Sequence, residues 1–200
     1  MNIIATHKTN KEADATASKS NANAINAKNP WINTIDEIAF RIANENSSAK
    51  SKMAKLLKLG TRLSNAIGEH SACAGNGCSF CCHQAVMITD LEAERIRALT
   101  NRDYKLSFPP YKPREDVKRF YGVPCIFLRE NSCSIYNERP LACRVSNNIG
   151  ASPFFCNSEI PASESEVHSL SVDGVWDSYF HVAKSANARL GDIREFFPEP

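Results

Sequence analysis

The spacing of apolar positions along the chain predicts amphipathic helices. In residues 48–69 the apolar side chains fall on one stripe of a helix that turns by about 100° per residue. That stripe contains Met53, Leu56, Leu63 and Ile67. A shorter helix should begin near Thr34, and a last one should cover residues 174–190 and stop at Gly191.

Local signals add three elements to the middle of the chain. Thr89 and Glu92 match a capping box, which predicts a helix over residues 90–99. Residues 137–143 suggest a short helix with a proline in its first turn. Two β-prone runs on either side of residues 129–132 suggest a hairpin. The expected fold class is therefore mainly α with a small β-hairpin, in a compact helical domain organised around a cysteine cluster.

The hairpin loop can be specified further. Cys125 and Cys133 face the same side of a hairpin only if the loop has an odd number of residues. A loop of residues 130–132, with Asn131 in the left-handed conformation, meets this condition.

Composition separates the first thirty residues from the rest. Residues 1–30 are mostly Asn, Ala, Lys, Ser and Thr, so they bury too little apolar surface to offset chain entropy, and we expect a disordered polar tail. Residues 31–200 fit one cysteine-cluster metal-binding domain, since the chain has 200 residues of which 42% are hydrophobic.

The charge pattern indicates few partners. The net charge of +2 gives no general case for nucleic acid, and no apolar run is long enough for a membrane span. Four cations share one face of the second helix, within residues 50–62: Lys52, Lys55, Lys58 and Arg62. A solvated face is the plain interpretation, and a protein partner is the alternative.

Cysteine content carries most of the chemistry. The chain has eight cysteines, seven of them between Cys73 and Cys143. The polar start of the chain resembles neither a signal peptide nor a transit peptide, so we expect a cytoplasmic protein in which thiols stay reduced. In that compartment such a pattern is typical of metal binding, with redox-active thiols and structural disulfides as alternatives.

The spacing suits a shared metal site. The Cys78-x-x-Cys81 pair can direct two sulfurs at one ion, with further ligands from distant segments. Adjacent Cys81 and Cys82 diverge, which leaves three arrangements: two neighbouring sites, one polynuclear centre, or one site with spare thiols. The roles of Cys156 and His83 stay open, and Arg139 and Arg144 either balance thiolate charge or act as ordinary cations.

Three segments follow one another between Cys73 and Arg144. They are Cys73-x4-Cys78-x2-Cys81-Cys82, the Thr-Asp-Leu-Glu helix start, and Pro124-Cys125 through Cys133-Ser-Ile-Tyr to Arg139-Pro-x-x-Cys143-Arg144. This run resembles the YkgJ-type cysteine-cluster family, with its CxxCxxCC pattern. The resemblance implies zinc or iron chelation. Its implied ligands are Cys73, Cys78, Cys81, Cys82, Cys125, Cys133 and Cys143. The gap between Cys73 and Cys78 is longer than in the family pattern.

Three functions are compatible with these observations. The first is a cytoplasmic protein that binds zinc or iron through clustered thiolates. The second is an iron–sulfur or non-haem iron oxidoreductase or methylase-related enzyme, although the chain has no GxGxxG, P-loop or CxxxCxxC motif. The third is a regulatory adaptor. The residues themselves do not decide whether the protein is an enzyme.

Overall fold

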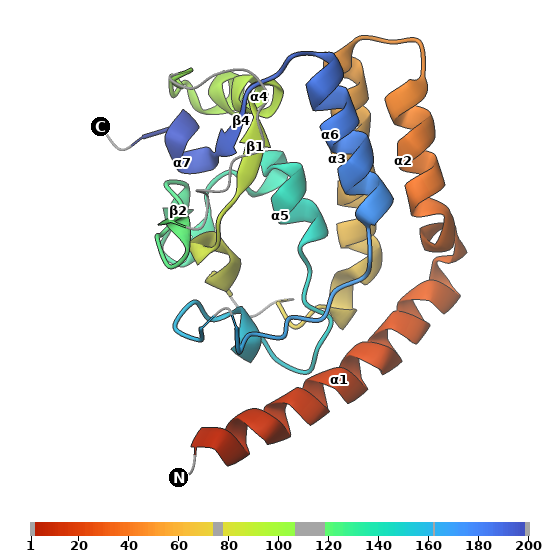
Figure 1. Cartoon of the computed structure of the whole chain (residues 1–200), viewed down its shortest axis with the longest axis vertical. Helices are drawn as coiled ribbons and strands as arrows, with labels where there is room; N and C mark the ends of the chain where they lie inside the picture. Colours follow the sequence, from red (N-terminus) through yellow and green to blue (C-terminus); the bar gives the residue numbers. More distant parts are fainter. Residues whose placement is uncertain (1–2, 74–77, 107–118, 162, 199–200) are drawn as a thin grey trace.

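The computed structural model describes residues 3–73, 78–106, 119–161 and 163–198. Three helices, α2 (Ile35–Asn44), α3 (Ala49–Ile67) and α6 (Asp173–Ser185), pack side by side (Figure 1). The other α-helices are α1 (Ile3–Lys28), α4 (Asp90–Thr100), α5 (Leu141–Val145) and α7 (Ile193–Phe196). Short 3-10 helices are η1 (Pro30–Thr34), η2 (Gly68–His70), η3 (Phe80–His83), η5 (Tyr136–Glu138) and η6 (Phe154–Cys156). The predicted fold class, mainly α with a small hairpin, is confirmed.

Helix α3 forms where its apolar stripe predicts. Ser48 caps its start by accepting a hydrogen bond from the backbone N–H of Ser51 at 3.2 Å. All four predicted stripe residues are buried. Gly60 lets α5 approach closely, because a Cβ atom there would lie only 2.8 Å from the side chain of Leu141. This contact fixes the helix that carries Cys143 against α3.

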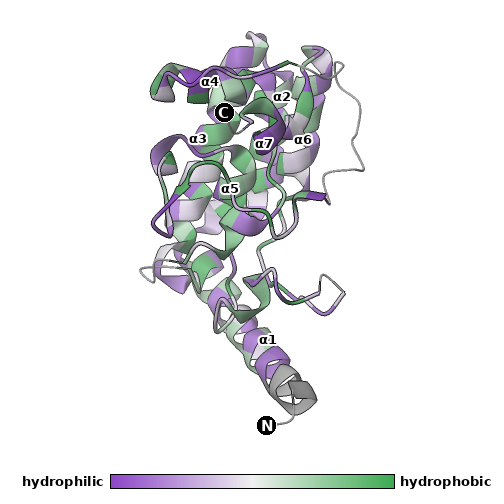
Figure 2. Cartoon of the chain, turned by 90° about the vertical axis from the view of Figure 1, so that its left-hand side faces the viewer, coloured by the Kyte–Doolittle hydropathy of each residue, from purple (hydrophilic) through white to green (hydrophobic). Residues whose placement is uncertain are grey.

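Helix α1 occupies residues for which the composition predicts a disordered tail. The helix has little apolar character, and Figure 2 shows it extending from the rest of the molecule with a mixture of polar and apolar residues. Three contacts outside the helix explain the difference. Ile25 is fully buried in the core, Asn21 donates to the carbonyl of Ile149, and Asp14 accepts from the backbone of Ala151. Such tertiary contacts cannot be read from local composition.

Helix α4 begins at the predicted capping box. The carboxylate of Glu92 accepts from the backbone N–H of Thr89 at 3.0 Å. The same carboxylate also accepts from the N–H of Leu141 at 2.9 Å and from the hydroxyl of Tyr179 at 2.5 Å. Burial raises the pKa of Glu92, against the effect of these hydrogen bonds. Glu92 therefore joins α4, α5 and α6 through one buried group.

The hairpin differs from the predicted loop. Strands β2 (Leu128–Arg129) and β3 (Ser132–Cys133) pair antiparallel with Leu128 opposite Cys133, which leaves a two-residue loop. Glu130 and Asn131 have φ values of 47° and 59°, the pattern of a type I′ turn. The three-residue loop is therefore wrong. The argument that an odd loop places Cys125 and Cys133 on one side does not apply. The N–H of Leu128 donates to the carbonyl of Cys125, and the turn closed by this bond leaves Cys125 outside the paired strands.

A second strand pair was not predicted. Strand β1 (Met87–Thr89) pairs antiparallel with β4 (Leu190–Asp192), and Ile88 lies opposite Gly191. The last long helix ends at Ser185 rather than near residue 190, since Asn187 takes a left-handed conformation with φ 51°. Gly191 is therefore a strand residue and not the predicted helix stop. The predicted short helix is also displaced, because Pro140 stands at the N-cap of α5.

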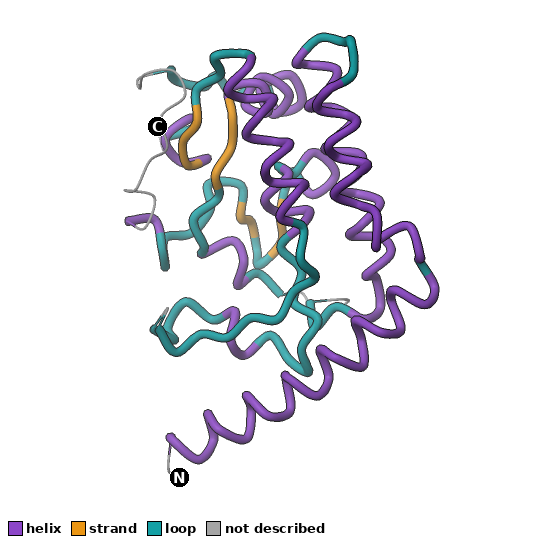
Figure 3. The backbone as a smooth tube through the Cα atoms, turned by 45° about the vertical axis from the view of Figure 1, so that its right-hand side comes forward, coloured by secondary structure: helices purple, strands orange, loops and turns teal. Residues whose placement is uncertain are grey.

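Two apolar clusters form the core. The larger one joins α2, α3, α5 and α6. The smaller one gathers residues from β1, α4, the hairpin and α7, and Cys125, Cys133 and Cys143 pack against it. Figure 3 shows long loop segments between the two strand pairs and α1. Among the described helices, none combines the length and apolar content that crossing a bilayer requires.

Candidate metal centre

All eight cysteines belong to the described residues, and all are free thiols. Cys81 is exposed and the other seven are half-buried. Two sets can be distinguished by what surrounds them. The core thiols are Cys82, Cys125, Cys133 and Cys143, and the loop thiols are Cys73, Cys78 and Cys156. Cys81 lies between the two sets, because its charge affects the pKa values of Cys78 and Cys143.

The loops that carry Cys73 and Cys156 meet at buried Asn148. The side-chain Nδ2 of Asn148 donates to Cys156 Sγ at 3.3 Å, and its backbone carbonyl accepts from the backbone N–H of Ala72 at 2.9 Å. The Ser71 hydroxyl lies 3.3 Å from the same carbonyl and accepts from the backbone N–H of Cys73. Asn148 thus joins two loops that are more than 70 residues apart in the sequence.

The loop thiols also interact with one another. A hydrogen bond from the Cys156 thiol lowers the pKa of Cys73 to about 6. The same bond raises the pKa of Cys156, and Cys73 also shares a hydrogen bond with Cys78. Cys73 therefore has the most thiolate character of this set.

The core thiols are held by backbone contacts and apolar packing. The N–H of Cys125 donates to the carbonyl of Cys82 at 2.6 Å, which binds the hairpin to η3. Burial raises the pKa of Cys143 well above its ordinary value, and the charges of Cys81, Cys125 and Cys133 raise it further. Cys125, Cys133 and Cys143 pack against the same apolar cluster, although they come from the hairpin region and α5.

Cys81 and Cys82 stand side by side in η3. A hydrogen bond from the Cys82 thiol lowers the pKa of Cys81 to about 7 and raises that of Cys82. A 3-10 helix turns by about 120° per residue, so the two side chains leave the backbone in different directions. The same pair can therefore contact two sets of thiols.

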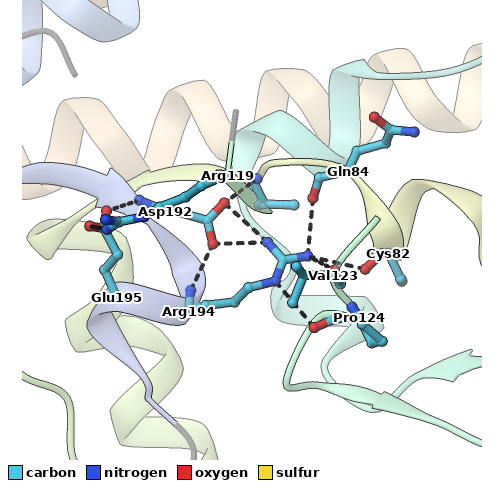
Figure 4. Close-up of polar contacts among 9 residues, drawn as sticks. Cys82, Gln84, Arg119, Val123, Pro124, Asp192, Arg194 and Glu195 are labelled. Atoms are coloured by element: carbon cyan, nitrogen blue, oxygen red, sulfur yellow. Dashed lines mark hydrogen bonds and ion pairs between the residues drawn. The ribbon is translucent and has the colours of Figure 1, made fainter. Parts of the chain in front are cut away.

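Arg194 secures the backbone on which the core thiols are placed (Figure 4). Its guanidinium donates to the carbonyls of Cys82 at 3.3 Å and Pro124 at 3.1 Å, the latter residue directly preceding Cys125. Asp192 accepts from Arg194 at 2.9 Å, and both side chains are buried. Sequence reasoning did not find this residue, because nothing in its local pattern separates it from a surface arginine.

The two arginines flanking Cys143 have different roles. Arg144 is buried and donates to the carbonyls of Asn137 and Arg139 at 2.8 and 2.6 Å, so it stabilises the backbone. Arg139 stacks on Tyr136 at 4.0 Å, and its charge lowers the pKa of Cys133 against a larger opposing effect of burial. Of the two interpretations, charge balance suits Arg139 and a structural role suits Arg144.

Two residues left open by the sequence are placed by the structure. Cys156 lies with the loop thiols and contacts Asn148. His83 is 3.3 Å from the carbonyl of Ser79 through Nδ1, which makes it a hydrogen-bond partner of the backbone. The basic face of α3 is partly engaged within the chain, since Lys55 pairs with Glu45 and Arg62 stacks on Trp31.

Thiols of this kind have the donor chemistry that zinc and iron–sulfur clusters require. Within the described part of the chain, no three side chains of His, Cys, Asp and Glu are already placed to hold an ion. Cys73 instead shares hydrogen bonds with Cys156 and Cys78, and Cys81 shares one with Cys82. Metal binding would require loss of the thiol protons and a closer approach of the sulfurs.

Comparison with known proteins yields one match. Residues 72–170 match a family model named CxxCxxCC and described as a "putative zinc- or iron-chelating domain". The matched segment contains all eight cysteines but neither α1 nor Arg194. No curated protein and no solved structure matches the chain.

Proposed function

Since the chain belongs to the CxxCxxCC family over residues 72–170, we propose that it binds zinc or iron through its clustered cysteine thiolates in the cytoplasm. The proposed ligands are drawn from the residues of the family pattern. These are Cys73, Cys78, Cys81, Cys82, Cys125, Cys133 and Cys143.

The observation that carries this proposal is the convergence of thiols from separate segments. Cys82 and Cys125 are 43 positions apart, yet their backbones are joined by a 2.6 Å hydrogen bond. Each free thiol is close enough to another to alter its pKa. Clustered thiols bind thiophilic metals because thiolates are soft ligands.

Metal binding would also stabilise the folded state. An ion shared by η3, the hairpin and α5 would close long loops, so removal of the metal should destabilise the fold.

Elemental analysis of protein purified without air tests the proposal. We expect bound zinc or iron, retained by the Ser79→Ala control and reduced in Cys125→Ser. A colourless zinc protein would indicate a mononuclear thiolate site, whereas brown colour that dithionite bleaches would indicate an iron–sulfur cluster. Protein that contains no metal, and takes up none after reduction and exposure to Zn²⁺ or Fe²⁺, would contradict the proposal.

A further inference from the structure

The eight thiols divide at the peptide bond between Cys81 and Cys82. On one side are the loop thiols around Asn148, and on the other are the core thiols against the smaller apolar cluster. We propose that this division marks two adjacent four-thiolate metal sites. The first contains Cys73, Cys78, Cys81 and Cys156, and the second contains Cys82, Cys125, Cys133 and Cys143. This inference rests on the proposed metal binding and adds Cys156, which lies outside the CxxCxxCC motif.

The geometry of η3 supports a division at this bond. Adjacent side chains in a 3-10 helix leave the backbone about 120° apart. The Cys81 and Cys82 thiols still share a hydrogen bond, so two sites divided at this bond would be directly adjacent. Cys78 lies two residues before η3, and its spacing from Cys81 is the short gap at which two cysteines can share one ion. Cys81 therefore belongs with Cys78, and Cys82 is left for the other set.

The first site is built around Asn148. This side chain is 2% exposed, and it donates to Cys156 Sγ while its backbone carbonyl binds the loop that carries Cys73. The Asn148 side-chain oxygen accepts from the N–H of Gly150 at 2.7 Å, which fixes the amide orientation. Cys156 is thereby held against Cys73 although 83 positions separate them in the sequence.

The second site is built on packed backbone. Cys125 precedes the hairpin, Cys133 is the last residue of β3, and Cys143 comes from α5. All three pack against the same apolar cluster. The Cys82 carbonyl accepts both the N–H of Cys125 and the guanidinium of Arg194, so the fourth ligand is joined to this set by two hydrogen bonds.

Ligand number and charge agree with two sites. Zinc takes four ligands in structural sites, and eight thiols supply two such sets without a shared or spare sulfur. Four thiolates and one divalent ion leave a net charge of about −2 per site. Arg194 donates to the carbonyl of Cys82 at 3.3 Å, so a cation lies beside the second site and can offset part of this charge.

Metal counting tests the division. Reduced, metal-free protein is titrated without air with Zn²⁺, and in parallel with Co²⁺, whose absorption reports tetrahedral thiolate ligation. We expect two ions per chain in the parent protein and one in Cys156→Ser. Cys143→Ser should also retain one ion, and the Cys143→Ser, Cys156→Ser double variant should retain none.

The controls separate this inference from the proposed function. Ser152→Ala changes the Cys156 loop without removing a sulfur and should keep both ions. A Cys73→Ser, Cys156→Ser double variant should keep one ion, since both losses affect the same site. A parent protein that binds one ion, or a Cys156→Ser variant with the parent's metal content, would overturn the division while leaving metal binding intact. A parent that binds no metal would instead contradict the proposed function.

Discussion

The loop thiols and the core thiols are held by different forces. The core thiols lie against a cluster of buried apolar residues, and many side chains share that packing. The loop thiols depend on a few polar contacts made by Asn148 and, through the neighbouring loop, by Asp14 of α1. Loss of one acceptor leaves a buried donor without a partner, whereas apolar packing weakens gradually. We therefore expect the loop set to be easier to disturb without unfolding the protein.

The two sets also differ in what lies outside the family segment. Asp14 supports the loop set from the N-terminal helix, and Arg194 supports the core set from α7. The family match at residues 72–170 contains neither support. The thiols alone are therefore an incomplete description of this centre.

The largest expected effect is on the core side. Arg194→Ala removes the partner of buried Asp192. It also removes six side-chain hydrogen bonds, four to backbone carbonyls and two to the Asp192 carboxylate. Removing one member of a buried ion pair typically costs about 3–5 kcal/mol in the free energy of unfolding. Urea denaturation should show this loss, while the exposed control Lys184→Ala should change stability by less than about 0.5 kcal/mol. A loss of similar size in both variants would contradict the assigned role of Arg194.

Glu92 tests the link from α4 to the helix that carries Cys143. Glu92→Gln should cost about 1–3 kcal/mol at neutral pH, because the amide cannot accept from all the donors that the carboxylate serves. The Thr100→Ala variant, in the last turn of the same helix, is the control and should cost less. Denaturation with urea at fixed pH measures both.

Burial also gives Glu92 a pH signature. Its pKa in the folded protein lies above the ordinary value of 4.5, so the folded state holds the proton over a range where the unfolded state has lost it. The contribution to the free energy of unfolding is complete below pH 4.5 and falls as the pH rises toward the folded pKa. Glu92→Gln should lack this slope, and an identical pH dependence in the two proteins would disprove the assignment.

Asp14 tests the loop side. Asp14→Ala removes the acceptor for the backbone N–H groups of Ala151 and Ser152, with an expected loss of about 1–2 kcal/mol. Thiol-labelling rates should rise at Cys156 and Cys73 but not at Cys143. Asp14→Asn keeps an acceptor and should recover part of the effect, and Glu12→Ala, on the exposed side of α1, is the control. Equal acceleration at all cysteines would show that the two sets are not independently supported.

The smallest expected change in the free energy of unfolding is at the hairpin turn that separates Cys125 from Cys133. Glu130 holds a left-handed conformation with φ 47°, which Asn tolerates better than Glu. Glu130→Asn should therefore raise the free energy of unfolding by about 0.5 kcal/mol, while Glu130→Gln should leave it unchanged. Loss of stability in the Asn variant would argue against the type I′ turn.

The sequence was most informative where one local signal decides the structure. The stripe of α3 and the Thr89–Glu92 capping box were found because helical periodicity and capping are local properties. The two-residue hairpin loop was missed because Glu130 is an unusual residue for a left-handed position. The pairing of β1 with β4 was missed because it joins residues about a hundred positions apart, and neither three-residue strand has a distinctive pattern.

The candidate site shows the same limit. The seven motif cysteines were identified from their spacing. Pairs of them hydrogen-bond in the structure, but within the described residues no three are placed to hold an ion, and whether they bind metal stays a prediction. Cys156 was left open because a lone cysteine in a loop has no spacing signal, and only Asn148 reveals its neighbours. Asp14 and Arg194 were missed, since their importance comes from partners that folding brings to them.

The position of Arg194 has a consequence for biosynthesis. During translation every cysteine leaves the ribosome before Arg194 does, since the last cysteine is residue 156. Until that arginine arrives, the carbonyls of Cys82 and Pro124 lack the guanidinium that fixes them in the finished protein. A nascent chain would thus present its sulfurs before their scaffold is closed, so maturation of the centre should be completed only after the final segment has been made.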